Sequence, residues 1–466
     1  MSRRLSIVAL AAALAGCTVG PDYHRPDVPG AVSAEWHEPG TPGPVDLAWW
    51  ENFHDPQLSA LVKRALAGSP DLAEARARLA EARANRDAAA GGRLPAVTAK
   101  GSATENVLSK NGQLPVGQIP GISRSLGLFD IGFDASWEID LWGRRTRQVE
   151  AADARSQAAE FGRRDVMLTL IAEVARNYFD LRSAQAEAAN ARATAAADAE
   201  LVRLSALRLR AGEISQLDQD RAEAAARASA AAVPDADARA AAAAYRIAAL
   251  VGAAPEEVAP GLLAPAPLPQ SPETILVGVR SELLTRRPDI GRAERELAAA
   301  TADIGVAKAD LFPRFSLLGG IGQQARTPGD LFSSASTRLQ IGPSFSWPIF
   351  EGGTIRAQIR AADARTDAAA ARYEKAVVGA LADSESAINR FLNARARLAE
   401  AEASLEREAA AFALAQRRAD AGEDDRLVLA RARQTLIAGQ QRRDQAVAAA
   451  DQAAVALYKS LGGGWS

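Results

Sequence analysis

Residues 126–141 alternate between large apolar and small or polar side chains, without a break from Phe129 onward. A period of two predicts a β-strand. One face of this strand would be apolar and the other acidic, which suits a membrane barrel wall with lipid outside and water inside. A sandwich strand also alternates, but its solvated face usually mixes Lys, Thr and Arg among the acids. The acids are Asp130, Asp134, Glu138 and Asp140.

The pattern becomes helical directly after this strand. Met167, Ile171, Val174, Tyr178 and Leu181 follow a 4-3-4-3 spacing, which is a heptad pattern. A helix over 144–211 would be on the order of 100 Å long. It is expected to end at Gly212, where glycine takes the left-handed C-cap conformation. A second helix, interrupted at Pro234, is expected to return to residue 252.

The whole arrangement then occurs a second time. Ser136-Trp137-Glu138-Ile139 is echoed by Ser346-Trp347-Pro348-Ile349, and Ala211-Gly212-Glu213 by Ala421-Gly422-Glu423. The offset is about 210 to 218 residues throughout. Spacing, motif and phase agree over most of the chain, so the sequence predicts a duplicated unit.

The predicted organisation runs from an N-terminal leader through two repeats. Residues 1–16 are predicted to be a signal peptide and 17–55 a lipid-anchored tether. The first repeat is 56–252, a Pro-rich linker is 253–272 and the second repeat is 273–462. The predicted strands are about 95–105, 126–141, 313–324 and 337–350, and the long helices about 144–211, 214–252, 353–421 and 424–461.

The first residues have the features of a secretory signal, with Arg3 and Arg4 before a short apolar core. Leu14-Ala15-Gly16-Cys17 resembles a bacterial lipobox, and Cys17 is the single cysteine of the chain. That resemblance implies a lipidated, palmitate-bearing Cys17 and, with Thr18 following it, sorting to the outer membrane. An ordinary signal peptide with an accidental cysteine is the alternative.

Composition and motifs point away from enzymes and nucleic-acid binders. The chain has 466 residues and a formal net charge of -2, so no nucleic-acid partner is expected. Its three histidines all precede residue 55 and lack the spacing of a zinc site. No phosphate-binding glycine loop followed by Lys and Ser or Thr occurs. We predict no catalytic site, no metal and no cofactor.

Four strands cannot close a barrel, and lipid does not tolerate an open sheet edge. Two chains would give about eight strands and a lumen filled by side chains. Three chains give 12 strands and an open pore. The predicted fold is therefore mainly α with a transmembrane β part, in which a trimer joins a 12-stranded outer-membrane β-barrel to a long periplasmic α-helical barrel.

The chain resembles the TolC-like outer membrane factor family, and its lipoprotein start resembles the NodT-like efflux branch. The resemblance covers essentially the whole chain. It is carried by WWENFHDPQL from Trp49, WEIDLWG from Trp137, SWPIFEGG from Ser346 and both Ala-Gly-Glu turns. It implies a homotrimeric exit duct in the outer-membrane lipid of a Gram-negative bacterium. The implied partners are a periplasmic adaptor and an inner-membrane pump, commonly of the resistance-nodulation-division type.

The resemblance also implies where the functional residues lie. Family members are thought to dock their adaptor at the hairpin tips, here Gly212, Glu213, Gly422 and Glu423. A gate is expected just beyond the tips, although relatives place an acid where this chain has Arg221 and Arg431. Ordinary C-caps and solvated helix charges are the alternatives. The candidate gate residues are Asp218, Asp220, Arg221, Asp424, Asp425, Arg426 and Arg431.

The sequence thus predicts a passive exit duct for small molecules. The four strand acids would line the lumen and favour cations. Two alternatives are the exit duct of a type I protein secretion system and a periplasmic coiled-coil lipoprotein that forms no channel. The alternating strands favour a channel over the second of these.

Overall fold

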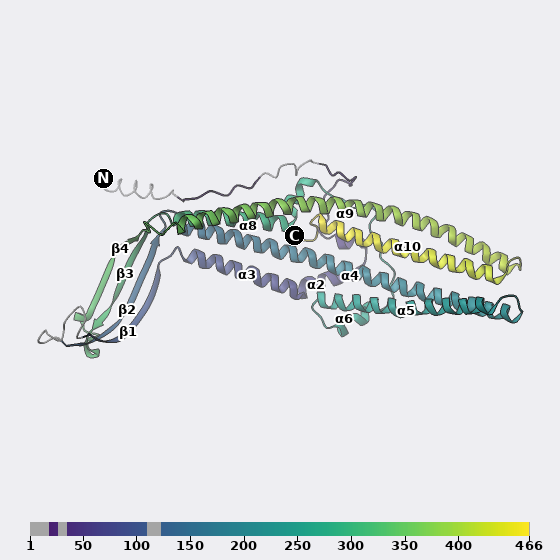
Figure 1. The fold of residues 1–466 in the computed structure, drawn as a ribbon, viewed down its shortest axis with the longest axis horizontal. Coiled ribbons are helices and arrows are strands. Elements are labelled where there is room, and N and C mark those ends of the chain that lie inside the picture. The colour runs from purple at the N-terminus through teal and green to yellow at the C-terminus, as the bar shows by residue number, and fades with distance from the viewer. Residues whose placement is uncertain (1–17, 27–34, 110–122, 466) are drawn as a thin grey trace. The chain divides into compact units, whose positions relative to one another are not determined.

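The computed structural model describes residues 18–26, 35–109 and 123–465. They form two compact units, each built from segments of both repeats. The first unit comprises 1–26, 80–158 and 293–373, and the second comprises 27–79, 159–292 and 374–466. The elements are labelled in Figure 1.

The first unit contains one four-stranded antiparallel sheet in the order β1-β2-β3-β4. Its strands are β1 (Ala96–Val107), β2 (Ser125–Ile139), β3 (Arg314–Ala325) and β4 (Thr337–Ser346). The two hairpins come from different repeats and join through the β2–β3 pair. β4 ends four residues before its predicted limit, because Ser346 pairs with the first residue of β3 and nothing beyond it has a partner.

The strand register sorts the side chains of this sheet into two faces. Phe133 lies opposite Ala99 on β1 and Ile321 on β3, and Ile321 lies opposite Leu339 on β4. This apolar face is exposed in a single chain, with Phe133 57% and Leu339 74% accessible. The opposite face carries mainly polar and small residues on all four strands, and its large apolar exceptions are Leu126, Leu128 and Leu318. It includes Thr98, Lys100, Ser102, Asp130, Asp134, Ser136, Glu138, Ser316, Gln324, Arg338, Gln340 and Ser344.

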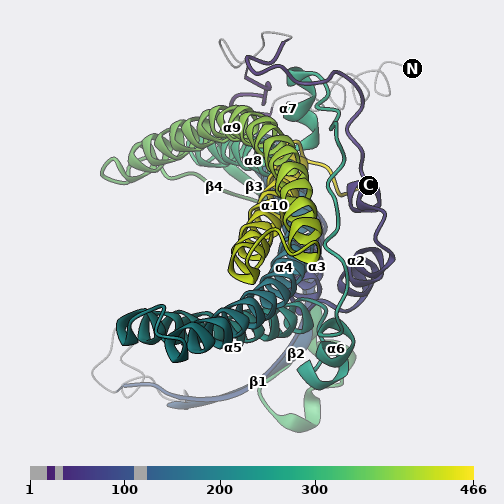
Figure 2. The same ribbon diagram turned by 90° about the vertical axis from the view of Figure 1, so that its right-hand side faces the viewer.

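The long helices form two hairpins of equal size. α4 (Arg144–Arg210) and α9 (Thr354–Asp420) have 67 residues each, and α5 (Gln216–Leu250) and α10 (Arg426–Ser460) have 35 each. Both views show α4 beside α5 and α9 beside α10 (Figures 1 and 2). Four of the five heptad positions on α4 are buried, as the spacing predicts. They are Ile171, Val174, Tyr178 and Leu181.

The predicted interruption at Pro234 is wrong, because α5 continues through it. Proline removes one backbone N–H and displaces the carbonyl four residues earlier, which here belongs to Ala230. Ala230 is exposed, so water can solvate that carbonyl. Alanines on both sides favour the helix strongly enough for it to continue.

The opening motif from Trp49 belongs to the core of the second unit. Trp49 is fully buried and stacks on Tyr458 of α10 at a centroid distance of 5.1 Å. Phe53 packs on Phe179 of α4. Asp55 caps α2 by accepting from the Leu58 amide. The motif therefore packs the segment before α2 against α4 and α10.

The remaining helices are short or intermediate in length. They are η1 (Trp49–Phe53), α2 (Pro56–Gly68), α3 (Pro70–Gly91), α6 (Pro255–Leu262), η2 (Arg280–Glu282), α7 (Leu283–Arg286), α8 (Pro288–Ala309), η3 (Pro328–Asp330) and η4 (Ser334–Ser336). Within the described ranges, no helix combines the length and apolar character needed to cross a membrane.

Replacing Gly252 with alanine is expected to destabilise the second unit by about 2–5 kcal/mol. Gly252 follows the end of α5 with φ +69°, and a Cβ there would lie 2.2 Å from the Gly68 carbonyl oxygen. This contact is with a backbone atom, so it cannot relax by rotating a side chain. The measurement is the thermal unfolding midpoint. Gly379→Ala on α9 is the control, because its Cβ would meet nothing within 4 Å, and a midpoint unchanged by Gly252→Ala would refute this packing.

Candidate functional site

The two hairpin tips have the same backbone structure. Gly212 and Gly422 both adopt φ +74° directly after the long helices. Behind each glycine a glutamate amide bonds back to the helix, from Glu213 to the Arg208 carbonyl and from Glu423 to the Arg418 carbonyl, both at 2.9 Å. These bonds form the C-cap motif that glycine allows.

At each tip, an arginine on the last turn of the preceding helix lies beside acidic side chains of the tip. Arg208 Nε lies 3.0 Å from the Glu213 carboxylate, and Arg418 Nε lies 3.8 Å from that of Glu423 and 2.9 Å from that of Asp424. These pairs are accessible to solvent, which screens them. They fix the shape of the tips more than their stability.

Three of the candidate gate acids have local structural contacts. Asp218 forms a capping box with Ser215 at the start of α5, and these hydrogen bonds lower the pKa of its carboxyl. Asp425 caps α10 by accepting from the Leu427 amide at 3.2 Å. Asp424 pairs with Arg418 at 2.9 Å.

The other candidate gate residues have fewer or longer polar contacts. Asp220 accepts from Gln216 at 2.8 Å, and Arg221 lies 4.0 Å from Asp218. Arg426 and Arg431 form no ion pair within 4 Å in the part of the chain that the structure describes. Both arginines are on the first turns of α10, so positive charge predominates there.

The two hairpins are bridged by polar contacts that sequence reasoning missed. α4 and α10 run antiparallel, and bridging side chains recur every eight to ten residues along them. The last bridge joins Arg208 at the first tip to Asp425 at the second, at 3.9 Å. No local pattern marks these pairs, because their members are more than 200 residues apart. The others are Asp180 with Gln452, Asn190 with Asp444, and Asp198 with Gln434.

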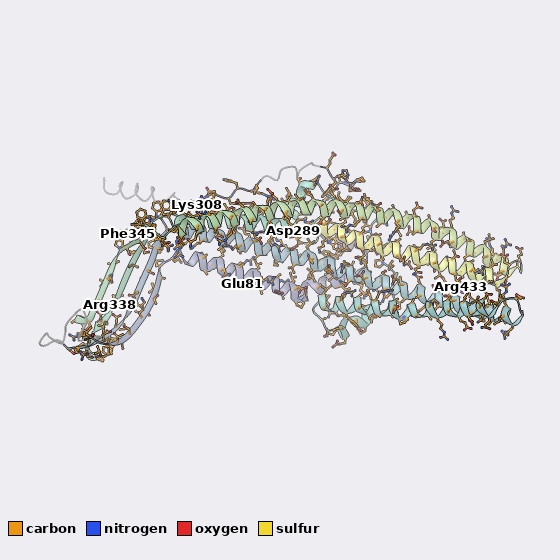
Figure 3. All side chains as sticks on the ribbon, viewed as in Figure 1. Glu81, Asp289, Lys308, Arg338, Phe345 and Arg433 are labelled. Atoms are coloured by element: carbon orange, nitrogen blue, oxygen red, sulfur yellow. The ribbon has the colours of Figure 1, made fainter. Side chains whose placement is uncertain are left out.

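On the polar face of the sheet, Arg338 binds two of the predicted lumen acids. Its guanidinium donates two bonds to Asp130, at 2.8 and 2.9 Å, and lies 3.7 Å from Asp134. Lys100 Nζ of β1 lies 3.1 Å from Asp134. The four charges cancel, so these acids do not give a negative surface. Figure 3 labels Arg338 on the sheet.

Glycines allow Arg338 to reach across the sheet. Arg338 starts on β4, passes over β3 and bonds to β2. A Cβ on Gly132 or Gly322 would lie 3.3 Å from its Nη2, and one on Gly320 would lie 3.4 Å from its Nη1. The guanidinium therefore lies directly over glycines, which have no side chains to block it.

The other two predicted strand acids lie where β2 turns into α4. Glu138 is bound by Arg144 and Arg145, at 2.5 and 2.8 Å. Asp140 lies beyond the end of β2, so its prediction as a strand residue is wrong. It accepts from the backbone amides of Arg145 and Thr146, at 3.0 and 2.8 Å, at the start of α4. Exposed helix N–H groups attract such a carboxylate.

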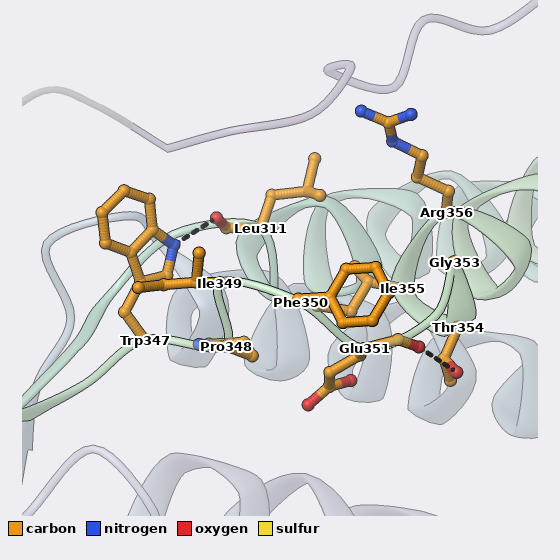
Figure 4. Close-up of a pocket in the computed structure, with 10 residues that line it drawn as sticks. All are labelled: Leu311, Trp347, Pro348, Ile349, Phe350, Glu351, Gly353, Thr354, Ile355 and Arg356. Carbon is orange, nitrogen blue, oxygen red and sulfur yellow. Dashed lines mark hydrogen bonds between the residues drawn. The ribbon is translucent and has the colours of Figure 1, made fainter.

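Tryptophans mark the corners where strands meet helices. Trp347 donates its indole N–H to the Leu311 carbonyl at 3.0 Å, and it lines a pocket of about 370 Å³ with Ile349 and Phe350 (Figure 4). Its counterpart in the first repeat, Trp137, donates to Arg93 at 2.9 Å. Rings with one satisfied polar end and an exposed apolar body suit a membrane–water interface.

Among the described residues, no cluster of three or more His, Cys, Asp or Glu side chains could hold a metal ion. Cys17, the predicted lipidation site, lies outside the described residues.

One buried acid was not anticipated from the sequence. Asp451 of α10 is 1% exposed, and its Oδ1 has no hydrogen-bond partner in the described chain. Burial raises the pKa of its carboxyl to about 8, against the opposing effects of Ser271, Arg395 and Arg443. An aspartate on an alanine-rich helix gives no signal of such burial.

We expect the protein to lose stability as the pH rises from about 4 to 8. Over this range the folded carboxyl of Asp451 keeps its proton and an unfolded one releases it, so the folded chain binds more protons. Asp451→Asn should raise the melting temperature by several degrees at pH 8 and change it little at pH 4. The exposed Asp220→Asn is the control. Equal effects of Asp451→Asn at both pH values would contradict this reasoning.

Comparison with known proteins places these features in a family. The family model described as "Outer membrane efflux protein" matches residues 61–253 and 279–463. The pyoverdine export outer membrane protein OpmQ of Pseudomonas aeruginosa is 32% identical, with 89% of this chain and 87% of OpmQ covered. Nodulation protein T of Rhizobium leguminosarum bv. trifolii is 29% identical, with 80% and 79% covered.

A solved structure of the outer-membrane channel OprN is similar along nearly the whole chain. Its TM-score is 0.85 at 40% sequence identity, covering 96% of this chain and 100% of the other. The predicted fold class is therefore confirmed. On the match of fold, family model and relatives, this chain belongs to the outer membrane efflux protein family.

Proposed function

We propose that three copies of this outer-membrane efflux protein form the exit duct of a tripartite pump. The observation that carries the proposal is the four-stranded sheet, with one apolar face and β1 and β4 at its edges. Unpaired edges are too costly in lipid, so β4 of one copy pairs with β1 of the next. Three copies supply the 12 strands of a water-filled barrel.

The two faces of the sheet set the orientation of each copy. The face with Phe133, Ile321 and Leu339 contacts lipid, and the face with Asp130 and Arg338 lines the lumen. Trp137 and Trp347 lie at the periplasmic boundary of the membrane. The long helices continue the duct into the periplasm, and this arrangement rests on the fold shared with outer-membrane channels.

The hairpin tips bind the periplasmic adaptor. Support comes from the two repeat-related tips, which share one backbone structure and are 210 positions apart (Gly212 and Gly422). A trimer therefore presents six near-equivalent tips. Two arginines at the start of α10, Arg426 and Arg431, control the opening that the tips surround. An inner-membrane pump, of the resistance-nodulation-division type, supplies the energy through the adaptor.

The exported compounds are small molecules. The relatives named for pyoverdine export and for solvent or antibiotic efflux support this class over protein secretion. Cys17 carries lipid that anchors the protein in the outer membrane of a Gram-negative host. The duct itself carries out no chemical reaction.

The test is drug and solvent susceptibility of a strain lacking this protein. The deletion is expected to lower the tolerated concentration of several small toxic compounds, and the intact protein should restore it. Unchanged susceptibility in the deletion strain, together with loss of a secreted protein, would favour the protein-secretion duct instead.

A further inference from the structure

The two free edges of the sheet are β1 and β4, which lie at its opposite sides (Figure 1). Every residue of β1 is exposed in a single chain, and so are most residues of β4. The proposed duct requires β4 of one copy to lie beside β1 of the next copy. Within one chain, the pairing of β2 with β3 already shows how strands of the two repeats fit together.

The strand register follows the sequence repeat without a slip. β2 and β4 correspond at an offset of 210 residues, and β1 and β3 at an offset of 218. The residues that give these offsets are Trp137 with Trp347, and Pro95 with Pro313. In the first hairpin Ala96 pairs with Ser136, and the offsets lead from these two residues to Arg314 and Ser346, which pair in the second hairpin. The two hairpins therefore have the same register.

The same offsets turn the β2–β3 pairs into pairs between copies. Phe129 of β2 pairs with Ala325 of β3. The corresponding residues are Leu339 of β4 and Val107 of β1, which would lie opposite each other across the interface between two copies. Both side chains belong to the apolar face and are open in a single chain, Leu339 at 74% and Val107 at 65%.

The next pair along the strands supports this register on the polar face. Asp130 pairs with Gln324 and accepts a hydrogen bond from its side-chain amide at 2.9 Å. The corresponding residues are Gln340 and Asn106 of the next copy. Both carry amide groups, so the hydrogen bond between the repeats has a counterpart between copies.

The backbone groups of both edges point in the direction that this pairing needs. Leu108 continues the β1–β2 register and donates its N–H to the Arg124 carbonyl at 2.8 Å. Since the direction alternates along a strand, even-numbered residues of β1 bond to β2 and odd-numbered ones, including Val107, point outward. The repeat gives β4 the same phase, so Leu339 also points outward. Pro343 is odd-numbered as well, and β3 does not need its missing N–H.

The end of β4 lacks a partner in a single chain. In the first repeat, β2 continues beyond its last pair with β1, and residues 137–139 pair with β3 alone. The corresponding residues of β4 are 347–349, which extend past the first residue of β3. Ile349, the last of them, is 84% exposed. The register places this segment opposite residues 97–99 of the next copy.

We infer that the next copy completes β4: residues 347–349 become strand against residues 97–99 of that copy, in the register that pairs Leu339 with Val107. The inference rests on the proposed trimer and adds the residues that meet at each interface. It also adds a change on assembly, because the end of β4 gains strand pairing only there. The limit near residue 350, predicted from the alternation of the sequence, is then reached in the assembled protein.

Disulfide trapping in outer membranes tests the register. Gln340→Cys with Asn106→Cys places two cysteines opposite each other at non-hydrogen-bonded positions, with Cα atoms about 4.5 Å apart. Mild oxidation should link three chains into one species that resists SDS and separates on reduction. Within one chain the two positions are separated by three strand spacings, roughly 14 Å, so they cannot form a disulfide there.

Gln340→Cys with Thr104→Cys is the matched control. A shift by two residues raises the Cα distance to about 7–8 Å, beyond the usual range of a disulfide. The yield of covalent trimer should be at least about tenfold lower than from the test pair. Each single variant controls for the one native cysteine of the chain.

Pro348→Cys with Thr98→Cys tests the completion of β4 in the same way, with Pro348→Cys and Ala96→Cys as its control. More covalent trimer from either control than from its test pair would overturn the register. Linkage through Gln340→Cys and Asn106→Cys alone would overturn the completion of β4. Linkage by no pair, in a protein with the mass of three chains, would overturn the inference and leave the trimer. A protein with the mass of one chain would instead count against the proposed function.

Discussion

Gly212→Pro or Gly422→Pro is expected to reduce export to the level of the deletion strain and leave trimers in the outer membrane. Proline fixes φ near −65°, whereas both glycines require +74°. It also removes the amide that Gly212 donates to Leu209, and that Gly422 donates to Ala419. The tip must open, and the pair between the preceding arginine and the tip glutamate is lost. The measurement is drug susceptibility of the complemented strain beside the yield of membrane trimers.

Gly329→Pro is the control for the proline itself. Gly329 lies in η3, between β3 and β4, and a Cβ there would meet nothing within 4 Å. Its φ is not in the left-handed region and it lies outside the tips, so export should persist. Normal export by the Gly212→Pro and Gly422→Pro variants would remove the tips from adaptor docking. Loss of trimers in these variants would show that the tips are needed for assembly.

Arg338→Gln is expected to make the open pore clearly cation-selective. The sequence alone predicts a lumen lined with acids that favour cations, but Arg338 and Lys100 balance Asp130 and Asp134. The wild-type pore should therefore show a weaker cation preference than the acids suggest. Removing one positive charge per chain leaves three uncompensated acids around a trimeric ring. The permeability ratio of potassium to chloride should rise by a factor of about 3 or more.

The measurement is the reversal potential of the protein in planar bilayers under a salt gradient. Arg326→Gln is the matched control, because Arg326 lies beyond the end of β3 and makes no ion pair in the described structure. It removes the same formal charge outside the cluster and should leave the ratio nearly unchanged. Equal shifts in both variants would show that Arg338 acts only through net charge. Unchanged selectivity in Arg338→Gln would contradict a lumen-facing cluster.

Periodic features of this fold were predictable from the sequence. The alternation around Phe133, the heptad of Ile171 and Tyr178, and the duplicated Gly212 and Gly422 turns each repeat at a fixed interval. Such patterns reflect which side chains share a face of one element, and that depends on local geometry. These patterns were sufficient to predict the strands, the helices and the family.

Contacts between distant segments were not predictable in this way. Arg338 and Asp130 are 208 residues apart, and Arg147 and Asp22 are 125 apart. In the sequence, Arg338 and Arg147 cannot be told apart from arginines that lie in solvent, because their partners are distant along the chain. Asp140 was misplaced for a related reason. A strand residue and a helix cap both prefer an extended backbone, and alternation does not distinguish them.

Pro234 shows the limit of local rules in another way. Proline ends most helices, but α5 extends 16 residues beyond it. Tertiary packing of Ala236, Ala240 and Ala243, all buried, stabilises the second half of the helix. The sequence shows that the proline destabilises the helix, but it does not show the tertiary packing that compensates for this destabilisation.

We propose that one copy provides only part of a channel wall and that three copies complete it. Native mass spectrometry of the protein, extracted from outer membranes in mild detergent, tests this most directly. We expect a single species with the mass of three chains, bearing lipid. A monomer that remains soluble without detergent would contradict it.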